Sequence, residues 1–323
     1  MNFTGDKIKV IWSSFALPAI EQIKRMDASG NIFWLIGAGG QKYLLRLSPA
    51  EEPRYRSPEE ISAEVELLDY LVENNFPVEK PIKDKNGQAV ITFGKHAGYL
   101  RKYTEGVFEE NPSLAKIEKF GRLLGRFHLA VENFKTKNNR EHIWDLKETK
   151  KNFIDDKTLI LESNFTDKEK FVKVFEREIN ALDFPDELPQ GTIHEDLGTR
   201  HVLWEKEEIV SVIDFDRCYY GKLVLDLGQA CRGWCLENDQ RWNNGKFKAL
   251  IGGYREKREL APLEKTCLAD AIKFGILERS LSFCLRSISG QKSLEEYARQ
   301  SLFNLTQELE NNRRLINDIL NQN

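Results

Sequence analysis

Residues 192–216, which read TIHEDLGTRHVLWEKEEIVSVIDFD, contain three side chains suited to phosphate and metal chemistry: Asp196, His201 and Asp214. Phosphoryl transfer requires a carboxylate that orients the attacking hydroxyl, together with oxygen-rich ligands that hold a metal ion across the phosphates. A polar His-x-Asp turn, then a hairpin, then an Asp at the end of a strand provides these groups. The segment therefore predicts a kinase-like active site.

A short β-hairpin is expected to position these side chains. Residues 202–204 are typical of one strand, residues 205–208 of a charged turn and residues 209–213 of the return strand, which places Asp214 at a strand end. Taken singly, a His-x-Asp turn is uninformative, and an Asp after an apolar strand is usually a turn or cap residue. Their order, with the hairpin between them, is what favours an active site.

Three motifs here resemble the catalytic loop and metal-binding strand of the aminoglycoside phosphotransferase and choline kinase-like superfamily, which includes type II homoserine kinases. They are residues 194–196 (HED), 213–216 (IDFD) and 225–228 (LDLG). In that superfamily the corresponding patterns are H-G-D-x-x-x-x-N, I-D-[FW]-[DE] and a D-L step into a helix. The resemblance implies that Asp196 is the catalytic base and that Asp214 is a magnesium ligand. It also implies a structural role for Asp226, as a helix cap or a brace for the loop.

The chain departs from the superfamily pattern at two positions. Glu195 replaces the usual Gly, and His201 stands where the superfamily has an Asn that binds magnesium. A neutral imidazole is a poor ligand for Mg2+, which prefers oxygen. The metal would then be held by Asp214 alone, or His201 would act through a water. Alternatively, His201 would admit a softer ion such as Mn2+, or activity would be weakened or lost.

Composition narrows the class of protein. The chain has 323 residues, 41% hydrophobic and 31% charged, with a net charge of -3, so it predicts a globular protein that binds neither nucleic acid nor an anionic membrane. It has no apolar run of membrane-spanning length and no signal-peptide core at its start. Five cysteines favour a reducing cytoplasm. Cys231 and Cys235 are expected to be buried helix thiols, because no second pair at zinc spacing accompanies them.

The order of predicted elements indicates an α+β chain with the bilobal protein kinase-like fold. Strand patterns cover residues 32–36, 43–47, 89–93 and 99–100, and a helical period covers residues 58–74. After about residue 106 the chain is mainly helical, apart from the hairpin. We expect an N-terminal nucleotide-binding lobe at residues 1–100, a hinge at 101–106 and a helical C-terminal lobe with the acceptor site at 107–323.

Two glycine-containing turns are candidates for a phosphate-binding loop. Residues 37–40 (GAGG) join two strands and open no helix, so they fit a tight turn better than a phosphate loop. The preceding turn, with Ser29, Gly30 and Asn31, is the better candidate, because backbone amides freed by such a turn can approach phosphate oxygens. The resemblance places the corresponding G-x-x-N segment over the nucleotide.

Other nucleotide contacts are expected in the N-terminal lobe and at its boundary. Arg46 on the strand at 43–47 would contact the α and β phosphates and be held by Glu64 of the next helix. The alternative is a surface arginine and a solvated glutamate. The resemblance implies an adenine-binding hinge that includes Arg101 and Tyr103, and an apolar contact from Ile213 beneath the base.

The C-terminal part offers fewer specific signals. His128, on an apolar helix over residues 117–131, is predicted to be a satisfied core histidine. Basic residues 135–140 are predicted to be a solvated loop, with an anionic acceptor contact as the alternative. Residues 293–323 favour a final amphipathic helix packed on the rear lobe or on a second subunit. Further candidates for acceptor contacts, which the sequence does not rank, are Arg232, Arg279 and Arg286.

The sequence therefore predicts a cytoplasmic ATP-dependent phosphotransferase that uses Mg2+, with Mn2+ as an alternative, and acts on a hydroxyl of a small polar metabolite. By resemblance, homoserine-like amino alcohols rank ahead of aminoglycosides as acceptors. The alternative is a nucleotide-binding pseudokinase, motivated by Glu195 and His201. A protein kinase fits less well, because the chain lacks a recognisable A-P-E element and an activation segment between Asp214 and Asp226.

Overall fold

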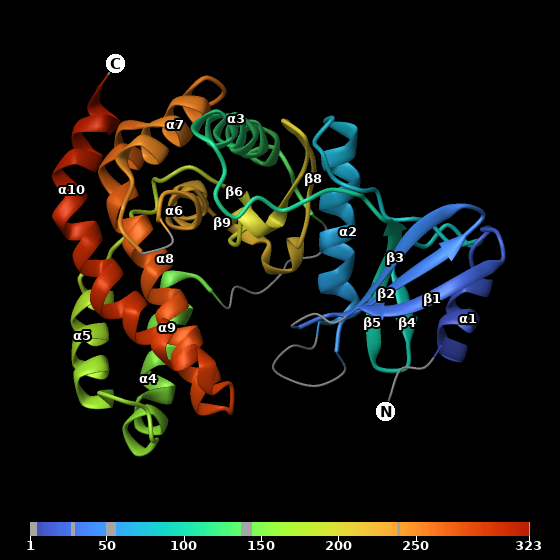
Figure 1. The fold of residues 1–323 in the computed structure, drawn as a ribbon, viewed down its shortest axis with the longest axis horizontal. Helices are drawn as coiled ribbons and strands as arrows, with labels where there is room; N and C mark the ends of the chain where they lie inside the picture. The colour runs from blue at the N-terminus through green and yellow to red at the C-terminus, as the bar shows by residue number, and fades with distance from the viewer. Residues whose placement is uncertain (1–4, 27–29, 50–55, 137–143, 238–239, 323) are drawn as a thin grey trace. The chain divides into compact units, whose positions relative to one another are not determined.

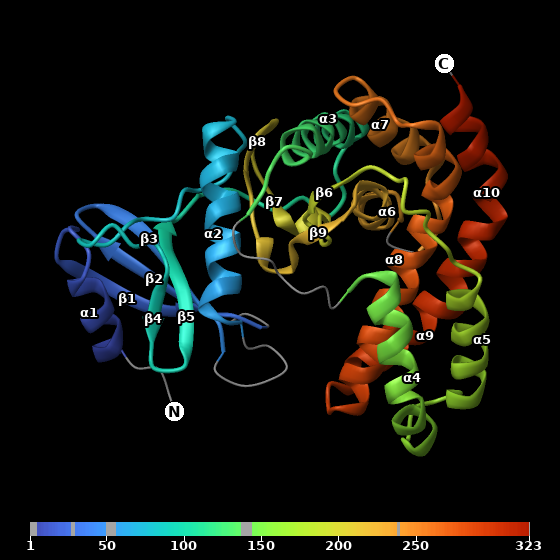
Figure 2. The ribbon, with the colours of Figure 1, turned by 180° about the vertical axis from the view of Figure 1, so that it is seen from behind.

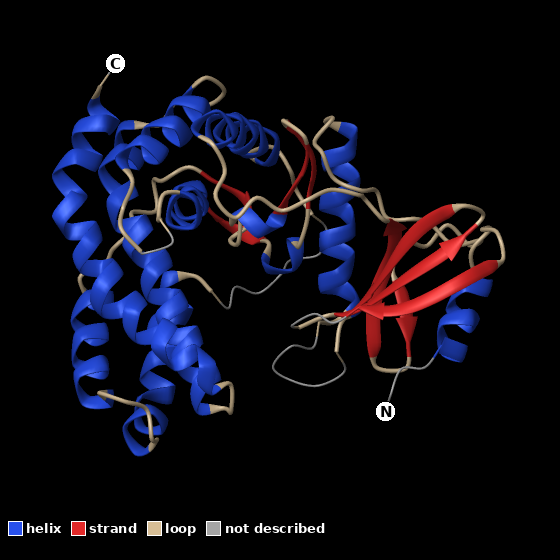
Figure 3. Cartoon of the chain, in the orientation of Figure 1, coloured by secondary structure: helices blue, strands red, loops and turns tan. Residues whose placement is uncertain are grey.

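The computed structural model describes residues 5–26, 30–49, 56–136, 144–237 and 240–322, and these form two compact units. The first unit comprises described residues within 1–107, 134–140 and 203–213, and the second comprises those within 108–133, 141–202 and 214–323. Strands dominate the first unit and helices the second (Figure 3). The predicted α+β class is therefore confirmed.

An antiparallel five-stranded sheet, in the order β1-β2-β3-β5-β4, forms the framework of the first unit (Figure 1). Its strands are β1 (Ile20–Met26), β2 (Ile32–Ala38), β3 (Gln41–Leu47), β4 (Ile91–Phe93) and β5 (His96–Lys102). The predicted tight turn between β2 and β3 is confirmed. Gly39 and Gly40 have φ values of +57° and +70° there, a combination that favours glycine.

The two faces of this sheet pack against different helices. Side chains alternate along a strand, so Tyr43, Leu45 and Leu47 of β3 point to one face and Arg46 points to the other. The first face shares a core with α1 (Gly5–Ser13), a helix that the sequence patterns did not predict. Arg46 on the second face meets α2 (Pro58–Glu73), which contains Glu64.

Helix α2 begins where the sequence predicts it. Ser57 caps it, accepting a hydrogen bond from Glu60 N, while the Glu60 side chain accepts one from Ser57 N. Pro58 occupies the first helical turn, where its missing N–H costs nothing. Helix α2 buries the apolar residues Ile61, Ala63, Val65, Leu67, Leu68 and Leu71.

The predicted hairpin is present as β7 (Val202–Glu205) and β8 (Glu208–Val212). Two backbone contacts tie it to the first unit: Trp204 pairs with Val107, and Val212 N donates to Pro77 O at 2.7 Å. These contacts explain why residues 203–213 group with the first unit, whereas the sequence assigned the whole hairpin to the C-terminal lobe.

The second unit combines helices with a two-stranded sheet of β6 (Gln190–Ile193) and β9 (Tyr219–Lys222). Figures 1 and 2 show α3 and α7 side by side. Its α-helices include α3 (Leu114–Val131), α4 (Leu146–Glu162), α5 (Lys168–Asn180), α6 (Leu223–Trp234), α7 (Asn244–Arg255) and α8 (Pro262–Ile288). One short 3-10 turn, Thr199–His201, contains His201, and another, Phe215–Arg217, directly follows Asp214.

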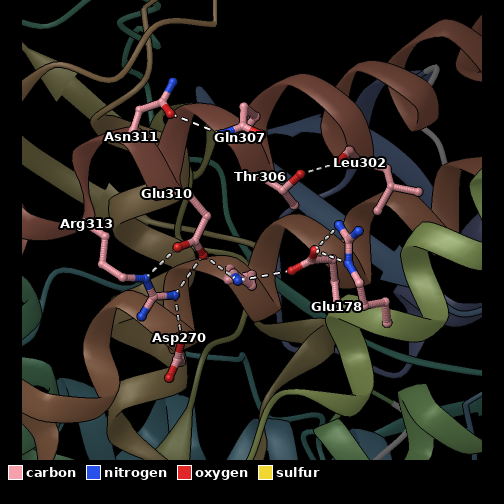
Figure 4. A network of polar contacts seen from close by, with 10 residues as sticks. Glu178, Asp270, Leu302, Thr306, Gln307, Glu310, Asn311 and Arg313 are labelled. Atoms are coloured by element: carbon pink, nitrogen blue, oxygen red, sulfur yellow. Dashed lines mark hydrogen bonds and ion pairs between the residues drawn. The ribbon is translucent and has the colours of Figure 1, made fainter.

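The C-terminal segment continues through 3-10 turn η3 (Lys292–Leu294), α9 (Glu295–Gln300), π-helical turn η4 (Ser301–Leu305) and α10 (Thr306–Asn321). Helix α10 packs on α8, which confirms a final helix on the rear lobe. In Figure 4, Arg313 of α10 lies between Glu310 of its own helix and Asp270 of α8, at 2.7 Å from the latter. Lys273 of α8 also pairs with Glu310 and with Glu178 of α5.

The cysteines are free and buried, and Cys231 and Cys235 lie in and directly after α6. The expectation of buried helix thiols is therefore confirmed. Among the described residues, no helix is both long enough and apolar enough to cross a lipid bilayer.

Candidate active site

The loop that follows β6 is held by a buried carboxylate of α6. Asp226 accepts hydrogen bonds from His194 N at 3.0 Å and from Glu195 N at 2.8 Å. The side chain of His128 lies 3.1 Å from the same carboxylate. Burial acts to raise the pKa of Asp226, but its contact with His128 outweighs burial and holds that pKa below its ordinary value. Asp226 thus braces the loop, one of the two structural roles expected for it.

His128 is a satisfied core histidine, as predicted. Its Nδ1 lies 2.7 Å from Tyr254 Oη, and Tyr254 Oη in turn accepts from Arg258 Nη1 at 2.9 Å. Because the Asp226 carboxylate can only accept, His128 carries its proton on Nε2, and Nδ1 accepts the Tyr254 proton. This chain of hydrogen bonds connects the loop to α3 and α7.

Asp196 occupies the middle of the loop and faces a cation. Nη2 of Arg279, on α8, lies 2.6 Å from Asp196 Oδ1. Burial acts to raise the pKa of Asp196, but the charge of Arg279 and its cationic neighbours Arg217 and Arg232 holds that pKa well below its ordinary value. Asp196 is therefore ionised at neutral pH, the form that accepts a hydrogen bond from a substrate hydroxyl.

Glu195, which stands where the resembling superfamily has Gly, has the left-handed backbone conformation that favours glycine, with φ of +70°. Its carboxylate is buried in contact with the Arg217 guanidinium and accepts from Gln229 Nε2 at 3.0 Å. Arg217 also donates to Glu278 of α8 at 2.8 Å. Burial raises the pKa of the Glu195 carboxyl to about 8, although Arg217 favours its charged form. The carboxyl group is thus enclosed within the second unit.

His201 and Asp214 lie together on the other side of the loop. His201 Nδ1 is in close contact with the carbonyl oxygen of Asp196, and its Nε2 lies 3.5 Å from Asp214 Oδ2. A ring nitrogen against a carbonyl must donate, so Nδ1 carries a proton and Nε2 is the ring nitrogen directed at Asp214. Asp214 has φ of +70°, a strained value for a residue other than glycine.

This pair fits a divalent ion that takes its remaining ligands from phosphate and water. A metal-binding histidine commonly donates its second ring N–H to a backbone carbonyl, which is the contact that His201 makes with Asp196. Among the described residues, no group of three or more His, Cys, Asp or Glu side chains is placed to hold a metal by itself.

In the first unit, Arg46 and Glu64 form a buried ion pair, so the alternative of a surface arginine and a solvated glutamate is wrong. Arg46 Nη1 donates to both Glu64 oxygens at 2.7 Å, and Arg46 is 3% exposed. Arg56 Nη1 and Tyr99 Oη also donate to Glu64. Burial acts to raise the pKa of Glu64, but Arg46 and Arg56 hold it well below its ordinary value.

The other predicted nucleotide residues also belong to the first unit. Gly30 has φ of +109°, and a side chain there would meet open space. Asn31 is buried, whereas Ser29 lies outside the described residues. Arg101 Nη1 donates to Lys102 O at 3.1 Å.

Tyr103 lies within the predicted hinge at 101–106, and its N–H donates to Lys42 O at 3.0 Å. Ile213 is half-buried and directly precedes Asp214. The second unit thus brings together Asp196, His201 and Asp214, while the remaining predicted residues that are described belong to the first unit.

Several residues of the site were missed or left unranked by the sequence analysis. Arg217 and Glu278, which are 61 residues apart, form the buried pair beneath Glu195, and neither belongs to a recognisable motif. Arg56, the second cation on Glu64, was also missed. Arg279 was one of three unranked candidates, and the structure places it against Asp196.

A cavity of about 470 Å3 lies elsewhere in the second unit, between the start of α4, residues 183–190 and β9. None of the predicted site residues is among those that line it. The cavity therefore provides no support for the predicted chemistry.

Comparisons with known proteins agree with the motif assignment. Residues 23–261 match the Phosphotransferase enzyme family. Homoserine kinase from Zymomonas mobilis is 27% identical over 73% of this chain and 71% of its own length. Homoserine kinase from Nitrobacter winogradskyi is 25% identical over 62% of this chain and 61% of its own length, less than two thirds.

Solved structures of small-molecule kinases share the fold. A microcompartment-associated aminopropanol kinase superposes with a TM-score of 0.70 at 17% identity, covering 97% of this chain and 99% of its own. Amicoumacin kinase in complex with AMP-PNP, Ca2+ and Ami gives 0.69 at 17% identity, covering 93% of each chain. Choline kinase from Cryptosporidium parvum gives 0.66 at 15% identity, covering 94% of this chain and 91% of its own.

Proposed function

Since the chain belongs to the phosphotransferase enzyme family, we propose that it transfers the γ-phosphoryl group of ATP to a hydroxyl of a small polar metabolite. The observation that carries this proposal is the grouping of Asp196, His201 and Asp214 on one loop and the strand end beside it. A negatively charged base next to a metal-binding pair is the equipment that phosphoryl transfer to an alcohol requires.

In this proposal Asp196 is the catalytic residue. Its carboxylate accepts a hydrogen bond from the acceptor hydroxyl, aligns the oxygen with the γ-phosphorus, and takes the proton as the new P–O bond forms and ADP leaves. Bracing by Asp226 fixes the backbone on which Asp196 depends. Arg46, held by Glu64, contacts the α and β phosphates, and Gly30, Asn31, Arg101, Tyr103 and Ile213 complete the nucleotide contacts.

Asp214 and His201 would hold a divalent ion, which would offset the negative charge of the phosphates. The orientation of His201 supports direct ligation, because its Nε2 is directed at Asp214, 3.5 Å from Oδ2. Nitrogen suits Mn2+ better than Mg2+. We therefore propose that both Mg2+ and Mn2+ support activity. We also propose that Mn2+ supports more activity with His201 than it would with Asn at position 201.

We propose a homoserine-like amino alcohol as the acceptor, ahead of aminoglycosides. Support comes from the homoserine kinases among the relatives and from the aminopropanol kinase among the solved structures. Free, buried cysteines support the cytoplasmic location expected from the sequence.

The alternative, a pseudokinase that binds nucleotide without turnover, rested on Glu195 and His201. The Glu195 carboxyl is buried in contact with Arg217, so it does not present an exposed negative charge to bound phosphates. The first of these two motives is thereby removed. His201 remains the motive for this alternative.

Replacing the catalytic base tests the proposal. With homoserine as acceptor, Asp196→Asn is expected to lower kcat by about 100-fold or more, the usual contribution of a general base. ADP release measures turnover, and a thermal-shift titration with ATP measures nucleotide binding, which is expected to persist. Asp155→Asn, on the exposed face of α4, is the matched control. Wild-type turnover by Asp196→Asn would exclude the assigned base, and binding without turnover of any acceptor by the wild type would favour the pseudokinase.

A further inference from the structure

Two arginines of the second unit approach the loop at Asp196 from different helices. Arg279 of α8 contacts Asp196 directly, with Nη2 2.6 Å from Oδ1. Arg232 lies in the last turn of α6, which packs on the same loop: Trp234 Nε1 donates to Leu197 O at 2.8 Å. The next residue in α6, Gly233, approaches Gly198 so closely that an added Cβ would lie 3.1 Å from its Cα.

Arg279 is buried but incompletely hydrogen-bonded. It is 7% exposed, and among the described residues neither its Nε nor its Nη2 makes a hydrogen bond. Asp196 and Glu278 lie within ion-pair distance of these nitrogens, but the N–H bonds are not aimed at their oxygens. Buried charged donors are costly to leave unsatisfied, so a ligand that accepts from Arg279 would be bound favourably.

A hydrogen bond orients the Arg232 side chain, but no paired carboxylate in the described part of the chain neutralises its charge. Its Nε donates to Gln229 Oε1 at 3.0 Å, and Gln229 in turn donates to Glu195. Among the described residues, no carboxylate lies within ion-pair distance of Arg232. Burial, followed by the positive charge of Arg279, lowers the pKa of Arg232 to about 10.

We propose that Arg232 and Arg279 form a subsite for a carboxylate of the acceptor, beside the hydroxyl that Asp196 orients. Guanidinium groups match the planar carboxylate through paired N–H donors, and an anion between them would relieve their mutual repulsion. This inference rests on the proposed function and deepens it: the acceptor is a small hydroxy acid, such as homoserine, whereas choline-like amines and polycationic aminoglycosides lack the group that the subsite binds.

A pair of acceptors that differ only in the carboxylate tests the subsite. Homoserine and 3-aminopropan-1-ol share the hydroxyl and the amine, and only homoserine has the carboxylate. The ratio of kcat/KM for homoserine to that for 3-aminopropan-1-ol is expected to fall about 100-fold in Arg232→Gln, because a desolvated charge pair is lost. Arg232→Lys keeps the charge but loses the fork, and is expected to retain part of the preference.

Arg314→Gln is the matched control, since Arg314 lies on α10 with an exposed side chain, 4.0 Å from Asp318. Its ratio is expected to remain that of the wild type. An unchanged ratio in Arg232→Gln would overturn the subsite, and so would an equal loss with both acceptors. Urea unfolding of each variant identifies any loss of activity that arises from loss of structure.

A binding experiment separates the subsite from the kinase proposal. L-2-Aminobutyrate has the amine and carboxylate of homoserine but no hydroxyl, so it binds without being phosphorylated. By isothermal titration calorimetry, Arg232→Gln is expected to weaken 2-aminobutyrate about 10-fold or more and to leave ADP unchanged. Weakened ADP with unchanged 2-aminobutyrate would assign the arginines to nucleotide phosphate and overturn the proposal.

The same titrations distinguish the two levels of inference. Arg232-dependent binding of 2-aminobutyrate by a protein that phosphorylates no acceptor would support the subsite and reject the proposed kinase. Efficient phosphorylation of 3-aminopropan-1-ol, without an effect of Arg232→Gln on either acceptor, would support the kinase and reject the subsite.

Discussion

At Glu195 the backbone has φ of +70°, which costs a residue other than glycine about 1 kcal/mol or more. The buried contacts of its carboxyl group with Arg217 and Gln229 offset that cost. Leaving a buried polar group unsatisfied typically costs about 1–3 kcal/mol, and more where that group is charged, as Arg217 is. The contacts therefore outweigh the backbone strain, and glutamate is tolerated at a position where the family pattern has glycine.

His201→Asn is predicted to change the metal preference of the enzyme. His201 Nε2 lies 3.5 Å from Asp214 Oδ2. Nitrogen favours Mn2+ over Mg2+ more than an amide oxygen does. The ratio of Mn2+-supported to Mg2+-supported kcat/KM is expected to fall about 10-fold in the variant. Pulsed electron paramagnetic resonance of bound Mn2+ is expected to show coupling to a histidine nitrogen only in the wild type.

The spectroscopic measurement does not depend on turnover, so it also applies if the protein is a pseudokinase. His96→Asn is the matched control, because His96 lies in β5 and contacts Ser48 O. Absence of nitrogen coupling in the wild type would show that His201 is not a metal ligand. Higher Mg2+-dependent activity in His201→Asn, with no change in coupling, would show that His201 merely obstructs the family's oxygen ligand.

The sequence identifies the site residues that lie close together in the chain, but not those that folding brings together. Asp196, His201 and Asp214 could be selected because they lie close together in one segment whose order matches a known chemistry. Arg217, Glu278 and Arg279 could not be assigned, because the contacts Arg217–Glu278 and Arg279–Asp196 join residues far apart in the chain. Such contacts depend on how α8 packs against the loop, which local periodicity does not encode.

At the scale of elements, α3 and α7 approach closely because glycines lie at their contact. A Cβ added at Gly253 would lie 2.0 Å from Glu118 O, and one added at Gly121 would lie 2.2 Å from Leu250 O. Neither distance is compatible with a side chain, so the backbones would have to separate. His128 and Tyr254, which support the loop after β6 through Asp226, lie on these two helices.

Gly253→Ala is therefore predicted to lower the free energy of unfolding by about 2 kcal/mol or more, through overpacking. The neighbouring Gly252→Ala is the matched control, because a Cβ there meets nothing within 4 Å. That control is expected to raise the free energy of unfolding by about 0.5–1 kcal/mol, since alanine is the better helix former. Urea unfolding followed by circular dichroism measures both. Equal effects of the two substitutions would show that α3 and α7 are not in close contact.

Element types were more predictable than their contacts. The strands β2 and β3 follow from alternation, and helix α2 follows from helical periodicity. Periodicity did not reveal α1, which is short and whose core contacts lie on β2, β3 and β5. The hairpin β7–β8 was predicted as an element, but its grouping with the first unit depends on contacts with Val107 and Pro77.

At the scale of the whole molecule, each unit has its own apolar core and its own buried charge cluster. In the first unit the cluster is centred on Glu64, and in the second it includes Glu195, Arg217 and Glu278. The proposed function assigns nucleotide contacts to residues of both units. A ligand stabilises the regions that bind it, so nucleotide binding is expected to stabilise the segments that contain both clusters.

ATP with Mn2+ is predicted to slow amide hydrogen exchange in two segments. One is residues 30–47 of the first unit, and the other is residues 194–214, which include the loop after β6 and the hairpin. At a ligand concentration of 100 times Kd, binding adds about 2.7 kcal/mol to the stability of the native state, so amides that exchange through full unfolding slow about 100-fold. Hydrogen exchange with mass spectrometry measures this for each segment, with Mn2+ alone as the control. Arg46→Gln leaves Arg56 on Glu64 and is expected to remove the added protection from residues 30–47. Protection confined to residues 194–214 in the wild type would show that Arg46 and the turn at Gly30 do not bind the nucleotide.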